Sequence, residues 1–548
     1  MTTIETHAHR AAPASGGLAC IADWVTTTDH KRIGRLYLGT STLALLGTAV
    51  VALLLGIERI NQDDYLLGLD ALTQAFSMYR FGLVLLVLLP VMAGLAVAAV
   101  PLQVGAKSIA FPRLAAAGFW LWLFGAGLGV YSLVMNGGPG GGERRFVELF
   151  LLSIALCLGG VLASTVSVLT TILTTRAPGM NLRRVPFFTW GVMVSSLALV
   201  VALPIVIGDL LIAYTGHKYP TAGVIEFGNL SLTQSWLSFG FTQPTTLLAA
   251  IPVFGLFADV MATGTGMRFT PRGPLLAAMG LAGVAVFAPV VQNPVVLRAP
   301  FRDLEAGDKF SDLLPFGLIH LLPALGAFLA LMLVVSMLKQ RPKVSAPLVF
   351  LLFGTLFVEL AFTASALNHI GDAGLVGTVF EEGTMLALVY GAVLAAMGGV
   401  AYWGPKWWGR TMPMKATLPL ALLGAAGAAL ASLPLMIAGF ADQPGQPFNV
   451  VLPGGNDPSV HFPQVGGPTE LWNGLSAAGH GLMVLTVVAF LGLALRSFLK
   501  GEHAGDDPWN GLTLEWATSS PAPADNFAEV HIVRSAEPLL DLKPRSDA

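Results

Sequence analysis

Long apolar runs recur along almost the whole chain, and they constrain its fold more than any other feature. A helix needs about 20 predominantly apolar residues to cross the hydrocarbon core of a bilayer. Hydrophobic residues make up 54% of the sequence, charged residues only 11%, and the mean hydropathy is +0.71. We therefore expect an all-α polytopic membrane bundle of about twelve transmembrane helices, near residues 36–57, 79–103, 115–136, 147–174, 186–214, 238–262, 274–296, 313–337, 346–366, 376–402, 416–440 and 472–497.

Basic residues lie in short clusters between these runs and predict the topology. The two longest loops on one side, 58–77 and 441–471, contain Arg59 as their single basic residue. The positive-inside rule then places both termini in the cytoplasm, in a bacterial inner membrane. The first 35 residues lack the apolar core of a cleavable signal. We divide the chain into a cytoplasmic N-terminal segment (1–35), a twelve-helix membrane domain (36–497) and a cytoplasmic tail (498–548).

Charge and cysteine content exclude some classes of function. The net charge is −2, so no broad basic field indicates a nucleic-acid partner. The chain has two cysteines, Cys20 and Cys157, which are too few for a disulfide framework or a thiolate metal site.

Several stretches resemble subunit I of the haem-copper oxidases, the cytochrome c oxidase family, in its bacterial form. They are "DWVTTTDHKRIGRLYLGTS" (23–41), "VPLQVGAKSIAFPRLAAAGFWLWLFG" (100–125), "YWGPKWWGR" (402–410) and "LTLEWATSSPAPADNF" (512–527). The resemblance covers almost the whole chain. It implies the twelve-helix fold of that subunit, and as partners other membrane subunits such as oxidase-like subunits II and III.

In that family, histidines hold haem and copper. The chain has ten histidines, and none stands at a position that the resemblance assigns to a ligand. Imidazole suits copper and haem iron, amides are weak ligands, and a phenolate binds haem iron only in some enzymes. The residues at the matching positions, which the resemblance marks as degenerate, are Tyr79, Gln243, Gln292, Asn293, Gly383 and Met385.

The proton-input residues and haem-anchoring arginines of the family are also missing. The resemblance places its proton-input acids at Ser108 and Thr245, its proton-input lysine at Ile319, and its haem-anchoring arginines within 438–446, which contains no arginine. We therefore expect no cofactor, neither haem nor copper, no catalytic residue and no metal site. An enzymatic role is uncertain and disfavoured.

Arg80 stands at the mouth of an apolar run, where an isolated charge is costly. The family fold brings this helix beside the one that contains Glu381 and Glu382, so we expect a buried polar cluster of Arg80, Glu381 and Glu382. In this hypothesis Arg80 forms a salt bridge with one glutamate, and Tyr79 fills the space of the low-spin haem. The alternative is that Arg80 reaches the lipid headgroups.

Further polar groups lie in or near the spans. For Asp209, Asp259 and Glu359 we favour structural pairing over ion handling, and for His480 a structural hydrogen bond over proton sensing. Gln243, Gln292 and Asn293 are expected to satisfy one another or to hold water.

Three functions are compatible with this sequence. The leading interpretation is a non-catalytic scaffold or regulatory partner, a pseudoenzyme, in a respiratory-type membrane complex. The first alternative is subunit I of a terminal oxidase that transfers electrons from cytochrome c to oxygen with unusual ligation. The second is an ion or small-molecule conduit through the emptied core.

Overall fold

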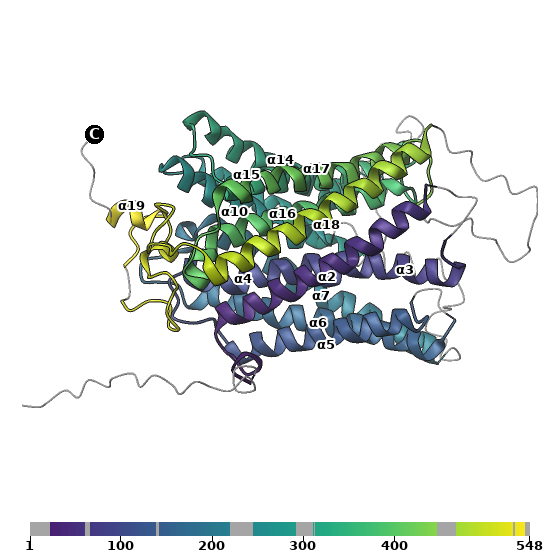
Figure 1. Cartoon of the computed structure of the whole chain (residues 1–548), viewed down its shortest axis with the longest axis horizontal. Coiled ribbons are helices and arrows are strands. Elements are labelled where there is room, and N and C mark those ends of the chain that lie inside the picture. Colours follow the sequence, from purple (N-terminus) through teal and green to yellow (C-terminus); the bar gives the residue numbers. More distant parts are fainter. Residues whose placement is uncertain are drawn as a thin grey trace, which may run out of the picture.

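The structure is a computed structural model that describes residues 22–60, 66–138, 142–219, 245–291, 297, 311, 313–445, 467–529 and 532–542. Helices dominate these ranges, and β-structure among them is limited to isolated bridges. Twelve helices in the described ranges are long and apolar enough to cross a membrane, which confirms the expected fold class (Figure 1). These spans are His30–Glu58, Ala71–Gln103, Pro112–Val134, Arg144–Thr174, Phe187–Lys218, Leu247–Thr265, Arg272–Val290, Leu313–Gln340, Ala346–Asn368, Val379–Trp408, Met414–Gly439 and Thr469–Lys500.

Some spans are divided where the helix geometry changes. A π-helical stretch, η1, interrupts the second span, and a second π-helical stretch, η5, opens the eighth. The elements are α2 (His30–Glu58), α3 (Leu69–Phe81), η1 (Gly82–Leu88), α4 (Leu89–Gln103), α5 (Pro112–Val134), α6 (Arg144–Thr174), α7 (Phe187–Lys218), α9 (Leu247–Ala250), α10 (Pro252–Thr265), α11 (Arg272–Ala282), α12 (Phe287–Val291), η5 (Gly317–Leu321), α14 (Leu322–Val335), α15 (Ala346–Asn368), α16 (Val379–Trp408), α17 (Met414–Gly439), α18 (Thr469–Lys500), η8 (Leu514–Ala517) and α19 (Pro538–Leu542).

Three spans form the interior of the bundle. The most apolar windows of Ala71–Gln103 and Val379–Trp408 are 94% buried, and that of Leu247–Thr265 is 89% buried. Small residues allow these helices to approach their neighbours closely. A side-chain carbon on Gly391 of α16, for example, would lie 2.8 Å from the Gly354 carbonyl oxygen of α15. The central helices are therefore where buried polar groups must find partners within the protein.

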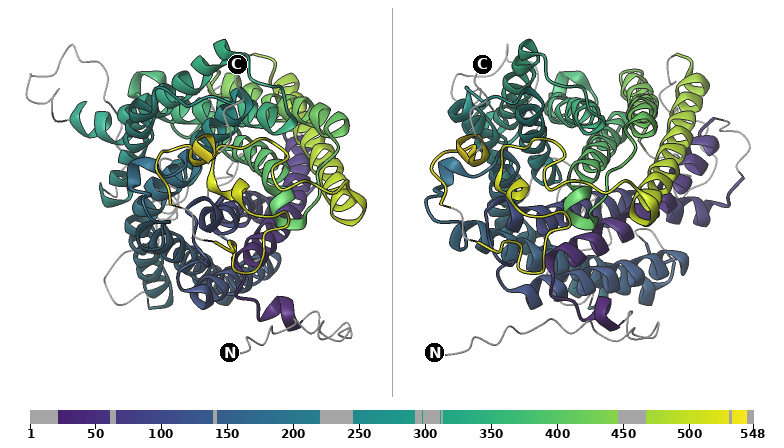
Figure 2. Two further views of the ribbon diagram at one scale, coloured as in Figure 1. Left: turned by 90° about the vertical axis from the view of Figure 1, so that its left-hand side faces the viewer. Right: turned by 60° about the vertical axis from the view of Figure 1, so that its left-hand side comes forward.

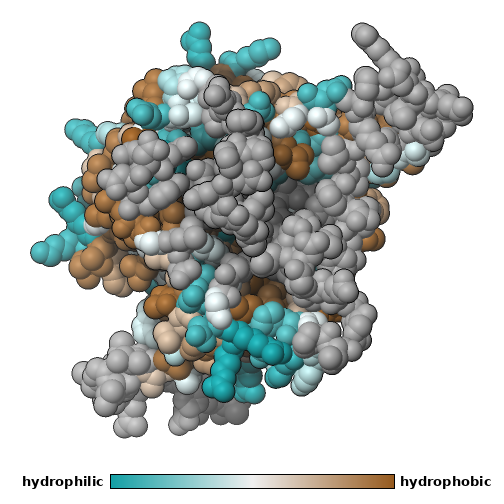
Figure 3. All heavy atoms as spheres, turned by 90° about the vertical axis from the view of Figure 1, so that its right-hand side faces the viewer, coloured by the Kyte–Doolittle hydropathy of each residue, from teal (hydrophilic) through white to brown (hydrophobic). Residues whose placement is uncertain are grey.

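The outer helices present apolar side chains to their surroundings. Leu43 on α2, Phe124 on α5 and Leu485 on α18 are 64%, 62% and 60% exposed. Figure 3 looks onto one end of the molecule and shows hydrophobic residues along its flank. Because water would disfavour such a surface and lipid would not, the bundle is a multi-pass membrane protein.

The chain after α18 folds back across one end of the bundle. Residues 502–529, which we call the C-terminal belt, run over this end in yellow in Figure 2. The Ala504 amide donates to the Gly409 carbonyl at the end of α16, and the Ala522 amide donates to the Lys406 carbonyl. Asn526 Oδ1 and His30 Nε2, at the start of α2, lie 3.0 Å apart in a hydrogen bond. The start of the first span and the belt therefore share one end of the bundle.

Candidate functional site

The residues proposed from the sequence fall into two groups in the structure. Tyr79 lies on α3, and Gly383 and Met385 lie on the neighbouring central helix α16; all three are buried. Gln243, Gln292 and Asn293 lie outside the described residues, so their polar cluster stays a prediction.

An ion pair occupies the region where α3 and α16 meet the end of α2. Arg59, directly after α2, donates from Nη1 to Glu382 Oε1 at 2.9 Å and from Nη2 to Glu382 Oε2 at 2.6 Å. The side chains are only 6% and 4% exposed. This bidentate geometry satisfies both carboxylate oxygens, which a buried pair needs if attraction is to offset the cost of desolvation.

Aromatic and imidazole side chains surround this pair. Tyr79 interacts electrostatically with Glu382, although its buried hydroxyl lacks a hydrogen bond of ordinary geometry within the described residues. The Tyr79 ring stands edge-on to the His480 ring with centroids 6.4 Å apart. A hydrogen bond of 2.8 Å joins the Tyr390 hydroxyl to His480 Nδ1, which is the structural role expected for this histidine.

Two amides fix the backbone next to the ion pair. Asn473 on α18 donates from Nδ2 to the Arg59 carbonyl at 3.0 Å, and its own Oδ1 accepts from Gln443 Nε2 at 3.0 Å. The Gln443 carbonyl in turn accepts from the Val379 amide at the start of α16.

We call Arg59, Glu382, Tyr79, Tyr390 and His480 the central cluster. Its residues lie on or next to α2, α3, α16 and α18 and bring these helices together.

The expected salt bridge of Arg80 is wrong. Glu382 pairs with Arg59, and Arg80 instead places its guanidinium carbon 5.0 Å from the centroid of the Phe76 ring, in a cation–π contact. Consecutive residues of a helix point about 100° apart. Since Tyr79 faces the interior, Arg80 turns toward the half-buried side of α3.

Glu381 does not join the ion pair either. Its Oε1 accepts from the Gly377 amide at 3.0 Å and from Asn368 Nδ2 at 3.4 Å, just before α16 begins. Glu381 therefore stabilises the entry into α16, while Glu382, one residue later, faces the bundle.

The two other candidate positions on α16 serve packing. A side-chain carbon on Gly383 would lie 2.8 Å from the Ser432 carbonyl oxygen and 3.0 Å from the Met436 amide nitrogen of α17. Met385 is 4% exposed and belongs to the hydrophobic core. Gly383 is thus a contact point between two helices.

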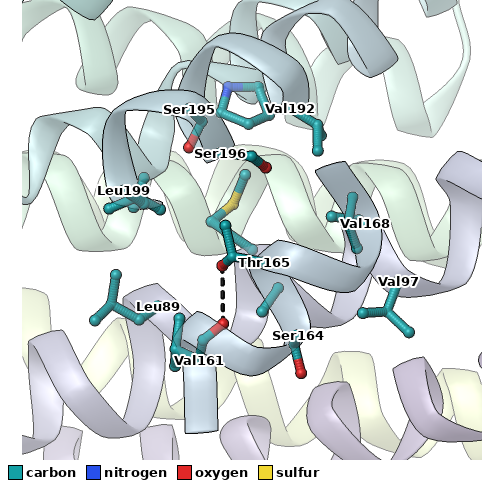
Figure 4. Close-up of a pocket in the computed structure, with 15 residues that line it drawn as sticks. Leu89, Val97, Val161, Ser164, Thr165, Val168, Val192, Ser195, Ser196 and Leu199 are labelled. Atoms are coloured by element: carbon teal, nitrogen blue, oxygen red, sulfur yellow. Dashed lines mark hydrogen bonds between the residues drawn. The ribbon is translucent and has the colours of Figure 1, made fainter. Parts of the chain in front are cut away.

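A small, mostly apolar cavity lies apart from the central cluster, among α4, α6, α7, α9 and α10. It measures about 30 Å³, and the serine and threonine hydroxyls in Figure 4 contribute to its wall. Thr165 Oγ1 donates to the Val161 carbonyl at 2.8 Å.

Sequence reasoning missed Arg59 as the partner of Glu382. The available signal was its position, because Arg59 is the only basic residue in the loops 58–77 and 441–471. A single cation on the side poor in positive charge points to an internal partner. The contact of Gln103 with Asp259 and Glu515 was also missed, because an amide and a tail carboxylate have no distinguishing pattern in the sequence.

Comparisons with known proteins agree with the resemblance. Residues 32–480 match the family model described as "Cytochrome C and Quinol oxidase polypeptide I". "Putative cytochrome c oxidase subunit 1-beta" of Streptomyces avermitilis is 28% identical, covering 95% of this chain and 92% of the relative. "Cytochrome c oxidase subunit 1" of Bacillus subtilis is 27% identical, covering 94% and 82%.

Two further matches concern length and fold. "Heme-copper oxidase subunit I+III" of Aeropyrum pernix is 29% identical over 95% of this chain, and the chain spans 63% of that relative's length. A solved structure titled "Cryo-EM structure of a heme-copper terminal oxidase dimer provides insights into its catalytic mechanism" aligns with a TM-score of 0.63 at 14% identity, covering 87% of this chain and 85% of that one. This likeness confirms the fold.

The expectation of no cofactor is contradicted by these relatives, whose names place them among haem-copper oxidase subunits. The residues at the described ligand positions nevertheless do not fit the histidine set of the family. Tyr79 offers a phenol, Met385 a thioether, and Gly383 no side chain. Within the described ranges no three His, Cys, Asp or Glu side chains gather in an arrangement that could hold a metal ion.

Proposed function

Because the chain belongs to the cytochrome c and quinol oxidase polypeptide I family, we propose that it is the subunit I component of a terminal-oxidase-type membrane complex. The observation that carries this proposal is the family match over residues 32–480, which includes most of the bundle. Electron transfer from cytochrome c to oxygen is the activity that the relatives' names assign to the complex. Haem and copper, named for the Aeropyrum pernix relative, are the groups to seek in that complex.

A second candidate is a scaffold or regulatory subunit that assembles with oxidase-type subunits II and III and does not reduce oxygen itself. The ion pair between Arg59 and Glu382 favours it. The pair stands beside Tyr79, at a position that the resemblance assigns to a ligand, and its hydrogen bonds link α2, α16 and α18. A subunit with this centre supports its neighbours through rigid polar packing.

Location and segments follow from the same reasoning. We propose a bacterial inner membrane with both termini in the cytoplasm, supported by the charge asymmetry of the loops. We propose that the chain divides into an N-terminal segment, a membrane domain and a C-terminal tail at residues 35 and 497. Part of this tail packs onto the bundle as the C-terminal belt.

One purification distinguishes the two candidates. The tagged full-length chain is isolated in mild detergent, its associated subunits are identified, and the complex is assayed for haem by the pyridine haemochrome spectrum, for copper content, and for oxygen uptake with reduced cytochrome c. Stoichiometric haem and copper with oxygen uptake support the oxidase. Associated oxidase-type subunits without haem, copper or oxygen uptake support the scaffold. A chain that purifies without any oxidase-type subunit contradicts both.

A further inference from the structure

Two buried carboxyl groups meet at the end of the bundle that the C-terminal belt crosses. Asp259 on α10 accepts hydrogen bonds of 2.9 Å from the amides of Phe187 and Phe188, the first residues of α7. These amides, with the positive end of the helix dipole, stabilise an ionised carboxylate. The two amides therefore satisfy both carboxyl oxygens of Asp259.

Glu515 comes to the same place from the belt. It lies on η8 (Leu514–Ala517) and is 0% exposed. Gln103 Nε2 donates to Asp259 Oδ2 at 3.2 Å and to Glu515 Oε1 at 3.1 Å. Since both oxygens bond the same nitrogen, they are at most 6.3 Å apart. Thr189 fixes the orientation of the amide, because its hydroxyl donates to Gln103 Oε1 at 2.7 Å.

The carboxyl groups of Asp259 and Glu515 differ in how fully hydrogen bonds satisfy their oxygens. Glu515 Oε1 also accepts from Trp403 Nε1 at 3.3 Å, but Oε2 is buried and has no hydrogen bond of ordinary geometry among the described residues. Thr513 Oγ1 interacts with this carboxyl group and is likewise buried without an ordinary hydrogen bond. Burial raises the pKa of Glu515, since water no longer solvates the charged form.

The two cations near the pair, Lys406 and Arg272, form their hydrogen bonds with other groups. Lys406 on α16 donates to the carbonyls of Asp506 and Thr518 in the belt. Arg272 on α11 donates to the carbonyls of Arg183 and Val185 and lies 3.7 Å from the carboxylate of Glu537.

Lys406 and Arg272 act on Glu515 and Asp259, respectively, through electrostatic interactions longer than a salt bridge, and further polar groups face the pair. Asp506 and Asp507 in the belt add negative charge near Lys406. The Tyr402 hydroxyl lies between Thr263 Oγ1 and Trp516 Nε1. In the part of the chain that the structure describes, neither Asp259 nor Glu515 forms a salt bridge.

We propose that Asp259 and Glu515 form a binding site for a single proton, which resides on Glu515, and that its occupancy keeps the C-terminal belt docked on the bundle. Two anions sharing one amide in a buried site repel each other, so the docked state favours one proton. When Glu515 ionises, the proton passes to bulk water. The Glu515 carboxylate is then more stable in solvent than buried between the docked belt and the bundle, so ionisation favours release of the belt. Docking is thus linked to pH, and this inference does not depend on the proposed oxidase function.

The sign of the linkage follows from the raised pKa. The stabilising contribution is fully present below the ordinary glutamate pKa of about 4.3 and is lost as the pH rises through the higher pKa of the docked state. For one proton, the docking constant falls by up to about tenfold per pH unit in this window.

Hydrogen exchange of the full-length protein in lipid nanodiscs tests the proposal. Protection factors, which are ratios to the intrinsic exchange rate at the same pH, are measured for amides of the belt from acid to alkaline pH. In the wild type, protection should fall by up to about tenfold per pH unit. Glu515→Gln, which keeps the shape without the charge, should give constant protection. Glu529→Gln removes an exposed carboxyl group of the same belt and should retain the wild-type profile.

Two results would overturn the proposal. One is a Glu515→Gln variant whose belt protection keeps the wild-type pH dependence. The other comes from infrared spectroscopy as the pH rises from the ordinary glutamate pKa of about 4.3. A protonated carboxyl band that shifts on deuteration in the wild type and is missing from Glu515→Gln supports the proposal, and a band that is unchanged in Glu515→Gln contradicts it.

Discussion

Arg59 and Glu382 form a bidentate ion pair with N–O distances of 2.9 and 2.6 Å, although 323 residues separate them in the sequence. Both side chains are almost fully buried. Removing one partner of such a pair leaves an unpaired charge in the interior, whereas replacing both with apolar groups removes the problem altogether. The loss of stability should therefore be larger for either single substitution than for the double substitution.

We expect Arg59→Met and Glu382→Leu each to destabilise the protein by about 3–5 kcal/mol. The double variant should lose much less than the sum of the single losses. Unfolding midpoints of the variants in one detergent measure these changes as a double-mutant cycle.

The matched control is the more exposed pair of Arg144 and Glu148, in which Arg144 is 57% exposed. Arg144→Gln should change stability by less than about 1 kcal/mol. Additive losses for Arg59→Met and Glu382→Leu would show that the two residues do not act as a pair.

The sequence predicted the spans better than it predicted contacts between them. Span positions depend on local hydropathy, which any window of the sequence contains. Pairing depends on which side of a helix a residue faces, and for this reason the predicted salt bridge of Arg80 was wrong. Tyr79 and Glu382 both face the interior, while their sequence neighbours Arg80 and Glu381 face elsewhere.

The belt was harder to foresee than the bundle. A polar tail rich in Pro and Ser gives no periodic signal that predicts docking. Its position instead depends on single contacts over long sequence separations, such as Asn526 with His30 and Lys406 with the Thr518 carbonyl. Such contacts become visible only when the helix ends are in place.

Gly383 should not tolerate a side chain. Because a methyl group there would lie 2.8 Å from the Ser432 carbonyl oxygen, Gly383→Ala must push α16 and α17 apart. We expect a loss of about 1–3 kcal/mol in the unfolding free energy. Gly492 on α18 has open space at the same position, and Gly492→Ala should be neutral or slightly stabilising. Equal effects of the two substitutions would refute the packing role of Gly383.

Asn526 should anchor the belt through its side chain. Its Oδ1 accepts from Lys31 Nζ at 3.0 Å and bonds His30 Nε2, while Nδ2 donates to the Ala106 carbonyl at 2.8 Å. Asn526→Gly keeps the left-handed backbone, with φ of 61°, but removes these bonds. It should cost about 1–3 kcal/mol and make the belt more sensitive to limited proteolysis.

The control for Asn526 is Asn510→Gly, since Asn510 also lies in the belt and has a positive φ of 54° but is exposed. Its proteolysis rate should match that of the wild type. Faster cleavage of both variants would mean that glycine itself loosens the belt.

His369 should make the protein less stable in acid. Its ring stacks on the His320 ring with centroids 3.9 Å apart, and burial lowers the pKa of His369. A lowered histidine pKa gives a contribution that is fully present above the ordinary value of about 6.5 and is lost as the pH falls through the lowered pKa. The melting temperature of the wild type should therefore drop on acidification below about pH 6.5, and the drop should be smaller in His369→Gln. The control is His503→Gln, which should follow the wild-type curve because His503 is exposed. If His369→Gln also follows the wild-type curve, the stacked histidine pair does not contribute to the acid sensitivity.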